Sequence, residues 1–359
     1  MKKFFFIAAI ASAALVSCTK NEAVQLEQNE ISFNKPIVGP QTKAPQPGEI
    51  DGNTYPDDER FNVYAVWHLN DFQTWDSPSS LYMHQVECGY DTDSWKPVGA
   101  EGKYYWPKEG KLTFAAYSPA DMTADNITYG KTGLTVEGFV PAAETVNQFD
   151  FLYAERTYDQ VEANYVSSDP DYDASFIYKG VDLKFRHALS QVVFKFKSDV
   201  AGVIDLQKVT ITNAQAKGTF NENVDETVAG YKSSPSWSFT GFETEKCNYN
   251  IYTQTTQDLL TTTDVEKNNS NADCIILPQT LEGVKLLLEY RIKRGNSAEF
   301  LPQTTEVTLS DKKDTGANII ASWDMAKRYT YTINITLDEI YFDPAVVDWV
   351  DVNMLEIVK

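Results

Sequence analysis

The sequence predicts an all-β fold built from antiparallel β-sandwiches. Many short segments alternate apolar and polar residues, and clusters of Gly, Pro, Asn, Asp and Ser separate them. Aromatic residues make up 13% of the chain, and most of them are Tyr and Phe, which favour strands. No segment keeps the apolar period of an amphipathic helix for more than about three turns. Short strands without long intervening helices indicate antiparallel sheets and not a parallel α/β fold.

Length and charge limit the domain count and the partners. A chain of 359 residues is long for one domain, so we expect two. Apolar residues make up 42%, which excludes wholesale disorder. The net charge is −20, and loss of residues 1–17 with Lys2 and Lys3 leaves −22, from 29 basic and 51 acidic residues. Such a surface repels a phosphate backbone, so nucleic acid is not an expected partner.

The N-terminus has the form of a lipoprotein signal peptide over residues 1–17. Lys2 and Lys3 precede an apolar run, residues 4–16, that is too short to span a bilayer. The run ends in Leu-Val-Ser-Cys, which resembles the bacterial lipobox and predicts lipidation of Cys18. Several acyl chains on one cysteine give stable anchoring, where a single chain is marginal.

A short first strand and an exposed loop follow. Residues 18–43 are predicted to form a lipidated tether and this strand, residues 31–38, and together they are a candidate propeptide. Residues 39–48 contain three prolines and two glycines, which predict an exposed, non-helical loop. Lys43 is the only basic residue in this loop, and such loops are where proteases cut most easily.

The remaining strands divide into two groups. Alternation predicts an N-terminal sandwich domain over residues 44–165, with strands at residues 61–67, 82–86, 112–117 and 149–154. A polar stretch then marks the boundary, and residues 166–359 are predicted to form the C-terminal sandwich domain. Its expected spine is a pair of strands within residues 181–197, joined by a short link. Further strands are expected at residues 209–212, 218–220, 236–239, 274–277, 285–292, 307–309 and 328–337.

Four stretches in this order resemble the fimbrillin family of Bacteroidales, the type V pilins and their minor subunits. The first is the lipobox ending in Cys18, and the second is YYWP at residues 104–107 followed by the strand at residues 112–117. The third is FRHALS at residues 185–190, leading into VFKF. The fourth is Trp323 followed by the alternating run from Tyr329 and by Trp349.

The resemblance implies two transthyretin-like sandwich domains in tandem and a lipoprotein that passes through the periplasm to the outer membrane. In polymerising members a trypsin-like protease cuts the loop after the first strand, and a strand of the next subunit fills the groove. Other fimbrial subunits and a host or bacterial surface ligand are then the expected partners. The bond between Lys43 and Ala44 is the candidate cleavage site. The best-studied protease is Arg-specific, so Lys43 departs from the pattern, and cleavage and an ordinary solvated lysine both remain open.

The residues themselves support such an exchange. Burial of three or four apolar side chains from residues 31–38 would contribute on the order of 5–10 kcal/mol, which is comparable with a whole domain's stability. A replacement strand would bind through main-chain pairing and side-chain pockets. Residues 329–359 are the candidate donor. Whether the chain serves as stalk, tip or anchor is not decided by the sequence.

The sequence offers no catalytic, cofactor or metal motif, so an enzyme is not expected. It has three histidines, and no G-x-S-x-G, H-E-x-x-H or Gly-rich phosphate loop. Asp169, Asp171 and Asp173 alternate in a linker, without the Gly and Glu of an EF-hand. Besides Cys18, three cysteines remain, Cys88, Cys247 and Cys274, so a complete disulfide framework is excluded. Pairing of Cys247 with Cys274 and buried free thiols both remain open.

Two tryptophans suggest an alternative function. Trp75 and Trp95 lie in loop-like stretches, where exposed aromatic rings would stack on sugars. The alternative is therefore a surface glycan-binding lipoprotein that does not polymerise. The favoured hypothesis is a fimbrillin-like outer-membrane lipoprotein, a structural or adhesive subunit of fimbriae assembled by β-strand exchange.

Overall fold

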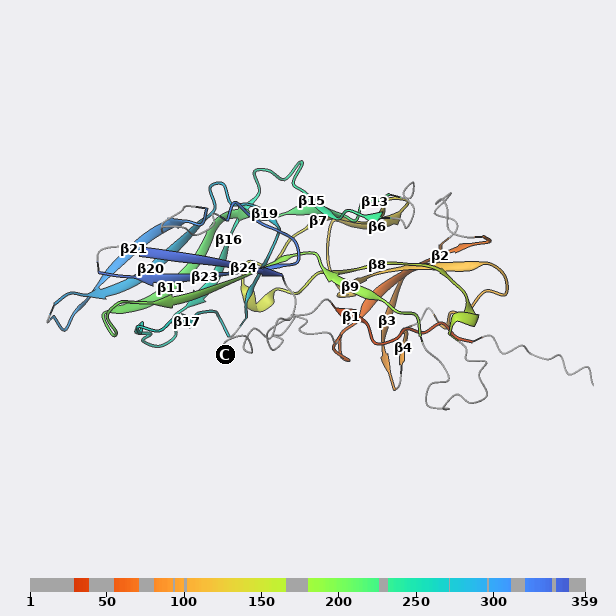
Figure 1. The fold of residues 1–359 in the computed structure, drawn as a ribbon, viewed down its shortest axis with the longest axis horizontal. Helices are drawn as coiled ribbons and strands as arrows, with labels where there is room; N and C mark the ends of the chain where they lie inside the picture. Colours follow the sequence, from red (N-terminus) through yellow and green to blue (C-terminus); the bar gives the residue numbers. More distant parts are fainter. Residues whose placement is uncertain are drawn as a thin grey trace, which may run out of the picture.

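The computed structural model describes residues 29–38, 55–70, 81–92, 94–99, 102–165, 180–225, 232–270, 272–295, 297–310, 320–337 and 340–348. They form packed β-sheets in an elongated molecule (Figure 1). The only helical elements among them are two short 3-10 turns, η2 (Thr145–Asn147) and η3 (Glu162–Asn164), and neither could cross a bilayer. The predicted all-β class is confirmed.

A seven-stranded sheet dominates one half of the molecule, in the order β1-β9-β8-β5-β2-β3-β4. Its strands are β1 (Ile37–Val38), β2 (Phe61–His68), β3 (Leu81–Asp91), β4 (Ser94–Pro97), β5 (Lys111–Ser118), β8 (Leu152–Gln160) and β9 (Lys184–His187). Neighbouring strands are antiparallel except β1 and β9, which are parallel. Both faces of this sheet carry buried apolar side chains.

A four-stranded sheet covers one of these faces, in the order β15-β12-β7-β6. Its strands are β6 (Asn126–Gly130), β7 (Gly133–Phe139), β12 (Gly218–Asn221) and β15 (Ser236–Ser238). Beside it lies a small hairpin of β13 (Val224–Asp225) and β14 (Lys232–Ser233). Phe220 of β12 packs against Phe151 and Tyr153, with ring centroids 5.1 and 5.0 Å apart. These contacts make the first sandwich.

The other half of the molecule is a second sandwich. One sheet has the order β17-β10-β23-β24, and β18 also pairs with β10. Its strands are β10 (Ser190–Lys197), β17 (Val265–Glu266), β18 (Cys274–Ile276), β23 (Lys327–Ile335) and β24 (Ile340–Asp348). The facing sheet has the order β16-β11-β20-β21. Its strands are β11 (Ile204–Gln215), β16 (Lys246–Thr253), β20 (Lys285–Lys293) and β21 (Phe300–Thr308). A short pair, β19 (Gln279–Thr280) and β22 (Ser322–Trp323), lies nearby.

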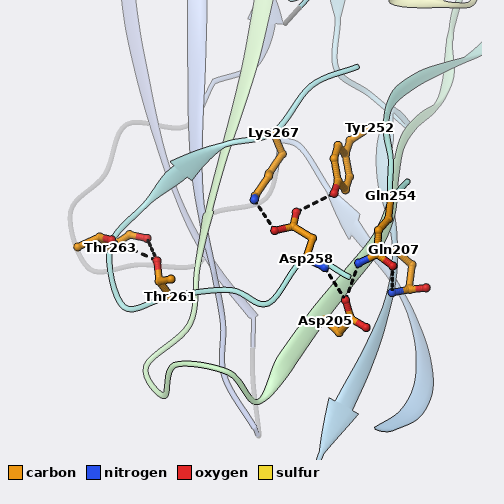
Figure 2. A network of polar contacts seen from close by, with 8 residues as sticks. All are labelled: Asp205, Gln207, Tyr252, Gln254, Asp258, Thr261, Thr263 and Lys267. Carbon is orange, nitrogen blue, oxygen red and sulfur yellow. Dashed lines mark hydrogen bonds and ion pairs between the residues drawn. The ribbon is translucent and has the colours of Figure 1, made fainter. Parts of the chain in front are cut away.

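A polar network fixes the loop between β16 and β17 to β11 (Figure 2). The side-chain amide of Gln254 and the backbone N–H of Asp258 donate to one carboxylate oxygen of Asp205, at 2.5 and 3.1 Å. Arg291 on β20 donates to the other oxygen. Asp258 in turn accepts from the Lys267 ammonium at 2.7 Å. These charged hydrogen bonds fix the loop together with Leu260, which is buried in the core of the second sandwich.

The predicted boundary between residues 165 and 166 does not separate the sheets. β9, β12 and β15 all follow residue 166, yet β9 pairs with β8 and β12 pairs with β7, both of which precede it, and β15 extends the same sheet beside β12. The reason is packing, since the side chains of this part of the chain complete the core of the first sandwich. Alternation along the sequence predicts that a strand exists but not which strand it pairs with.

The expected spine within residues 181–197 is also divided. Its two predicted strands are present as β9 and β10, but they belong to different sheets and do not pair with each other. His187 ends β9, and its Nδ1 lies 2.6 Å from the buried carboxylate of Asp150. The link that follows, Ala188 and Leu189, is buried and carries the chain from one sandwich to the other.

Candidate functional site: the N-terminal strand and its seat

Residues 29–38, the first-strand segment, form the edge strand β1 beside β9 and also pair at Phe33 with β4, the strand at the other edge of the seven-stranded sheet. We call the surface that holds this segment the seat, and it comprises β4, β9 and residues 104–106 and 180–183. Figure 1 shows β1, the end of the segment, beside β9, with β3 and β4 close by. The segment therefore joins one edge strand of the sheet to the other.

Main-chain hydrogen bonds connect the segment to the β4 side of the seat. The backbone N–H of Phe33 donates to the Trp95 carbonyl at 2.8 Å, and that of Trp95 donates back at 3.2 Å. The N–H of Ile31 donates to the Tyr104 carbonyl at 2.7 Å. The N–H of Trp106 donates to the Asn29 carbonyl at 3.2 Å. This is the bonding of an inserted strand and not of a surface loop.

A second set of main-chain bonds connects the opposite edge of the segment to the β9 side. The backbone N–H of Val181 donates to the carbonyl of Ser32 at 2.9 Å. The N–H of Asn34 donates to the carbonyl of Val181 at 3.1 Å, and that of Ile37 donates to the carbonyl of Leu183 at 3.1 Å. The segment is thus bonded on both edges, which is the geometry of a central strand.

The apolar side chains of the segment fill the core beneath it. Ile31, Phe33 and Val38 are 0–1% exposed. The Phe33 ring meets Phe61 and Phe114 edge to face, with centroids 5.8 and 5.7 Å apart. Full burial of three such side chains contributes roughly 5–9 kcal/mol. Loss of the segment would therefore expose an apolar groove with unpaired backbone groups on both sides.

Polar contacts at the rim of the seat are exposed and individually weak. Lys103 donates to Glu30 at 2.8 Å, and this hydrogen bond raises the pKa of Lys103. The side-chain amide of Asn34 donates to the Asp182 carboxylate at 2.6 Å. Exposed charged pairs contribute at most about 1 kcal/mol each. Main-chain pairing and apolar burial therefore hold the segment in place.

Gly180 is a seat residue that the sequence did not single out. A Cβ at this position would overlap the main chain of Phe33 and Asn34. Only glycine lets the segment approach the seat this closely. In the sequence, only the position of this glycine just before an alternating strand could have indicated a close main-chain approach. That position does not show which segment approaches.

Trp95 was predicted to be an exposed loop residue suited to sugar stacking, and that prediction is wrong. Trp95 lies in β4, opposite Tyr90 of β3, and is 1% exposed. Its ring packs against Tyr55 and Phe61, with centroids 5.1 and 5.6 Å apart. The two strands are joined by a tight turn, and the turn residues resemble a loop in the sequence. Trp95 is a buried residue of the seat, and its ring has no exposed surface on which a glycan could stack.

The other predicted site residues lie outside the described residues: Cys18, Lys43, Ala44 and Trp75. Cys88, Cys247 and Cys274 carry free thiols, and burial raises the pKa of each. In the part of the chain that the structure describes, no three His, Cys, Asp or Glu side chains gather in a way that could hold a metal ion. The seat is therefore the site that the described residues build.

Comparison with known proteins agrees with this architecture. A family model described as fimbrillin-like matches residues 50–349. No curated protein sequence matches. A fimbrial protein of Bacteroides vulgatus has a similar structure, with a TM-score of 0.60 and 15% identity over 89% of this chain and 100% of that one.

Two further structures share the fold. A candidate cell-adhesion protein of Bacteroides ovatus has a TM-score of 0.51 and 15% identity, over 91% of this chain and 99% of that one. One from Bacteroides uniformis has a TM-score of 0.50 and 16% identity, over 89% and 98%. At these identities the likeness concerns the fold alone.

Proposed function

The chain belongs to the fimbrillin-like family, and from this membership we propose that it is an outer-membrane lipoprotein that builds surface fimbriae by β-strand exchange. Acylation of Cys18 would carry it through the periplasm to the outer membrane, where a protease would cut between Lys43 and Ala44. The first-strand segment would then leave, and a strand of another subunit would occupy the seat. The proposal assigns the chain a structural or adhesive role and no catalysis.

One observation carries the proposal: the first-strand segment makes main-chain hydrogen bonds along both of its edges. Residues 29–38 bond to β4 on one side and to residues 181–183 on the other, and they bury Ile31, Phe33 and Val38. A groove of this kind binds an extended peptide through main-chain hydrogen bonds, while its pockets select the side chains. Lys43 follows Val38 by five residues, so a cut there leaves the whole segment on the released fragment.

The packing of the two sandwiches supports the tandem architecture. Each consists of two sheets with a buried apolar core between them. We propose that these are the two transthyretin-like domains of the family, with the first completed by β9, β12 and β15. Trp95 does not favour the alternative of a glycan-binding lipoprotein, because its ring is buried.

The test uses protein taken from the outer surface of the native cells. Its N-terminal residue is identified by mass spectrometry, and its migration is examined for an SDS-resistant ladder. An N-terminus at Ala44 together with a ladder is the result expected of an exchanged fimbrial subunit. An acylated Cys18 on material that is only monomeric would contradict polymerisation and would fit an anchor, a cap or a stand-alone surface lipoprotein.

A further inference from the structure

Lys267 and Asp258 form a lysine–carboxylate pair that is largely buried in the second sandwich. The Lys267 ammonium lies 2.7 Å from Oδ1 of Asp258, and the two side chains are only 14% and 19% exposed. Six other lysine–carboxylate pairs each have at least one side chain that is 48% exposed or more. The pair of Lys267 with Asp258 is therefore held out of water to an extent that those surface pairs are not.

Main-chain hydrogen bonds fix the positions of both residues. The N–H of Asp258 donates to the Asp205 carboxylate at 3.1 Å, and its carbonyl accepts from the N–H of Leu206 at 3.0 Å. The N–H of Lys267 donates to the carbonyl of Phe194 at 3.0 Å. Asp258 is thus anchored to β11 and Lys267 to β10, on the two facing sheets. Two groups held together in this way need no further ordering in order to react.

A phenol contacts the second oxygen of the same carboxylate. The hydroxyl of Tyr252, on β16, donates to Oδ2 of Asp258 at 2.7 Å, while the Lys267 ammonium contacts Oδ1 (Figure 2). Burial and the adjacent Asp258 carboxylate raise the pKa of Tyr252, so the hydroxyl keeps its proton at neutral pH. A fixed donor at Oδ2 stabilises the negative charge that develops there when the carboxyl carbon is attacked. The three side chains thus supply a nucleophile, an electrophile and an oxyanion donor.

We propose that Lys267 and Asp258 condense into an intramolecular isopeptide bond, an amide between two side chains, with Tyr252 as the oxyanion donor. The new bond joins Nζ of Lys267 to Cγ of Asp258. The reaction occurs once in each chain, so it gives the protein no enzymatic turnover. It does not depend on strand exchange at the seat.

The reaction balances without a co-reactant. Because the exclusion of water disfavours charged forms, the ammonium passes one proton to Oδ1 and leaves a neutral amine beside a neutral acid. The amine attacks Cγ, and negative charge collects on Oδ2, where Tyr252 donates. A second proton then moves from Nζ to Oδ1, which leaves as water. Oδ2 becomes the amide oxygen, and the third proton stays on Nζ.

The link would close a covalent ring over residues 258–267. Leu260 within this ring is buried in the core of the second sandwich. The strand β17, also within the ring, pairs with β10. The ring would therefore fasten the loop between β16 and β17 to both facing sheets, and it would restrict the unfolded chain as a disulfide does.

The test is the mass of tryptic peptides from the denatured full-length protein. Trypsin cuts after lysine, and in this region the lysines are Lys246, Lys267 and Lys285. An ordinary ion pair gives separate peptides of residues 247–267 and 268–285. The proposal predicts no cut after Lys267 and a single peptide of residues 247–285 that is lighter than its sequence by the mass of one water. Recovery of the two separate peptides at full mass would overturn the proposal.

Lys267→Arg distinguishes this bond from another loss of water. Asp258 alone could lose water by cyclising onto the main chain, which would leave residue 267 free. The variant keeps the positive charge and the tryptic site, and both peptides should return at full mass. A loss of water that persists in this variant would overturn the proposal. Lys195→Arg, in the exposed pair with Asp264, is the matched control and should leave the linked peptide unchanged.

Tyr252→Phe tests the oxyanion donor. The variant keeps the ring and removes the hydroxyl that contacts Oδ2, so the link should form on the order of 100-fold more slowly. The linked fraction of the peptide is followed against time after synthesis, for the variant and for wild type. Equal rates in the two proteins would overturn the role assigned to Tyr252.

Discussion

Asp205 is a carboxylate whose side chain has no exposed surface, and its neighbours keep it ionised. Burial alone raises its pKa, but hydrogen bonds from Gln254 and Arg291 outweigh burial, and the pKa lies below its usual range. An acid with a lowered folded-state pKa stabilises the fold above its unfolded pKa of about 3.9. This stabilisation is lost as the pH falls through the folded pKa.

We therefore expect Asp205→Asn to weaken the pH dependence of stability in acid. Between pH 5 and pH 2 the free energy of unfolding of the wild type should fall more steeply than that of the variant. Urea denaturation at several pH values measures the free energy of unfolding of both proteins, and its slope against pH is compared. Asp264→Asn is the control, because this residue is exposed and lies outside the network. Parallel slopes for wild type and Asp205→Asn would show that the network does not stabilise the charge.

Glu222 in β12 has the opposite pH dependence. It is 1% exposed and accepts a hydrogen bond from the backbone N–H of Leu134 at 2.8 Å. Burial raises its pKa, so the folded state binds the proton more tightly than the unfolded state. Stability from this group is present at low pH and declines as the pH rises from about 4.3 through the folded pKa.

Glu222→Gln keeps the acceptor and removes the charge, so this decline should disappear. Relative to wild type, the variant is expected to gain stability steadily between pH 4 and pH 7, as measured by thermal melting across that range. Glu222→Ala serves as a comparison, because it also loses the bond to Leu134 and should be less stable than Gln at every pH. A difference in stability between Glu222→Gln and wild type that stays constant across this range would contradict the assignment.

At the scale of elements, we expect Phe33 to contribute more than any other side chain of the first-strand segment to the stability of its packing in the seat. Phe33→Ala removes a ring that is 1% exposed and packed edge-on against two others. The free energy of unfolding should fall by about 3–5 kcal/mol, as measured by urea denaturation of the uncut protein. Ile37→Ala, on an exposed side chain of the same segment, should change it by less than about 0.5 kcal/mol.

Alternation predicted the existence of this strand, and the structure explains why it did not predict the seat. Ile31 and Phe33 indicate a buried face from sequence alone, whereas Trp95 and Gly180 contact the segment only after the chain has folded back. Local patterns record periodicity, but the partner of a strand is set by tertiary packing. For the same reason β9 and β10 were expected as one pair and lie in different sheets.

At the scale of the whole molecule, the two sandwiches are interlocked. Ile275 and Leu277 of the second half contribute to the core of the first sandwich, and β12 and β15 complete its second sheet. The residues before position 166 therefore lack three strands of the first sandwich, β9, β12 and β15. A boundary placed by composition at residue 165 falls between β8 and β9, which are neighbours in one sheet, whereas the chain passes to the second sandwich only after β9.

Interlocking predicts a single cooperative unfolding transition for the full chain. Phe220→Ala, which removes a ring packed between the sheets of the first sandwich, should lower the temperature of the entire transition without splitting it. Differential scanning calorimetry measures this effect. Leu301→Ala, at a side chain that is 48% exposed on β21, is the control and should leave the transition in place. Two transitions, of which only one responds to Phe220→Ala, would indicate independent domains.

Strand exchange at the seat is the central claim, and cryo-electron microscopy of native fimbriae that contain this protein tests it most directly. The account predicts that, in each subunit, density between β4 and β9 connects to a neighbouring subunit and that residues 29–38 of the same copy are absent. Density that connects every seat to its own first-strand segment would contradict the account.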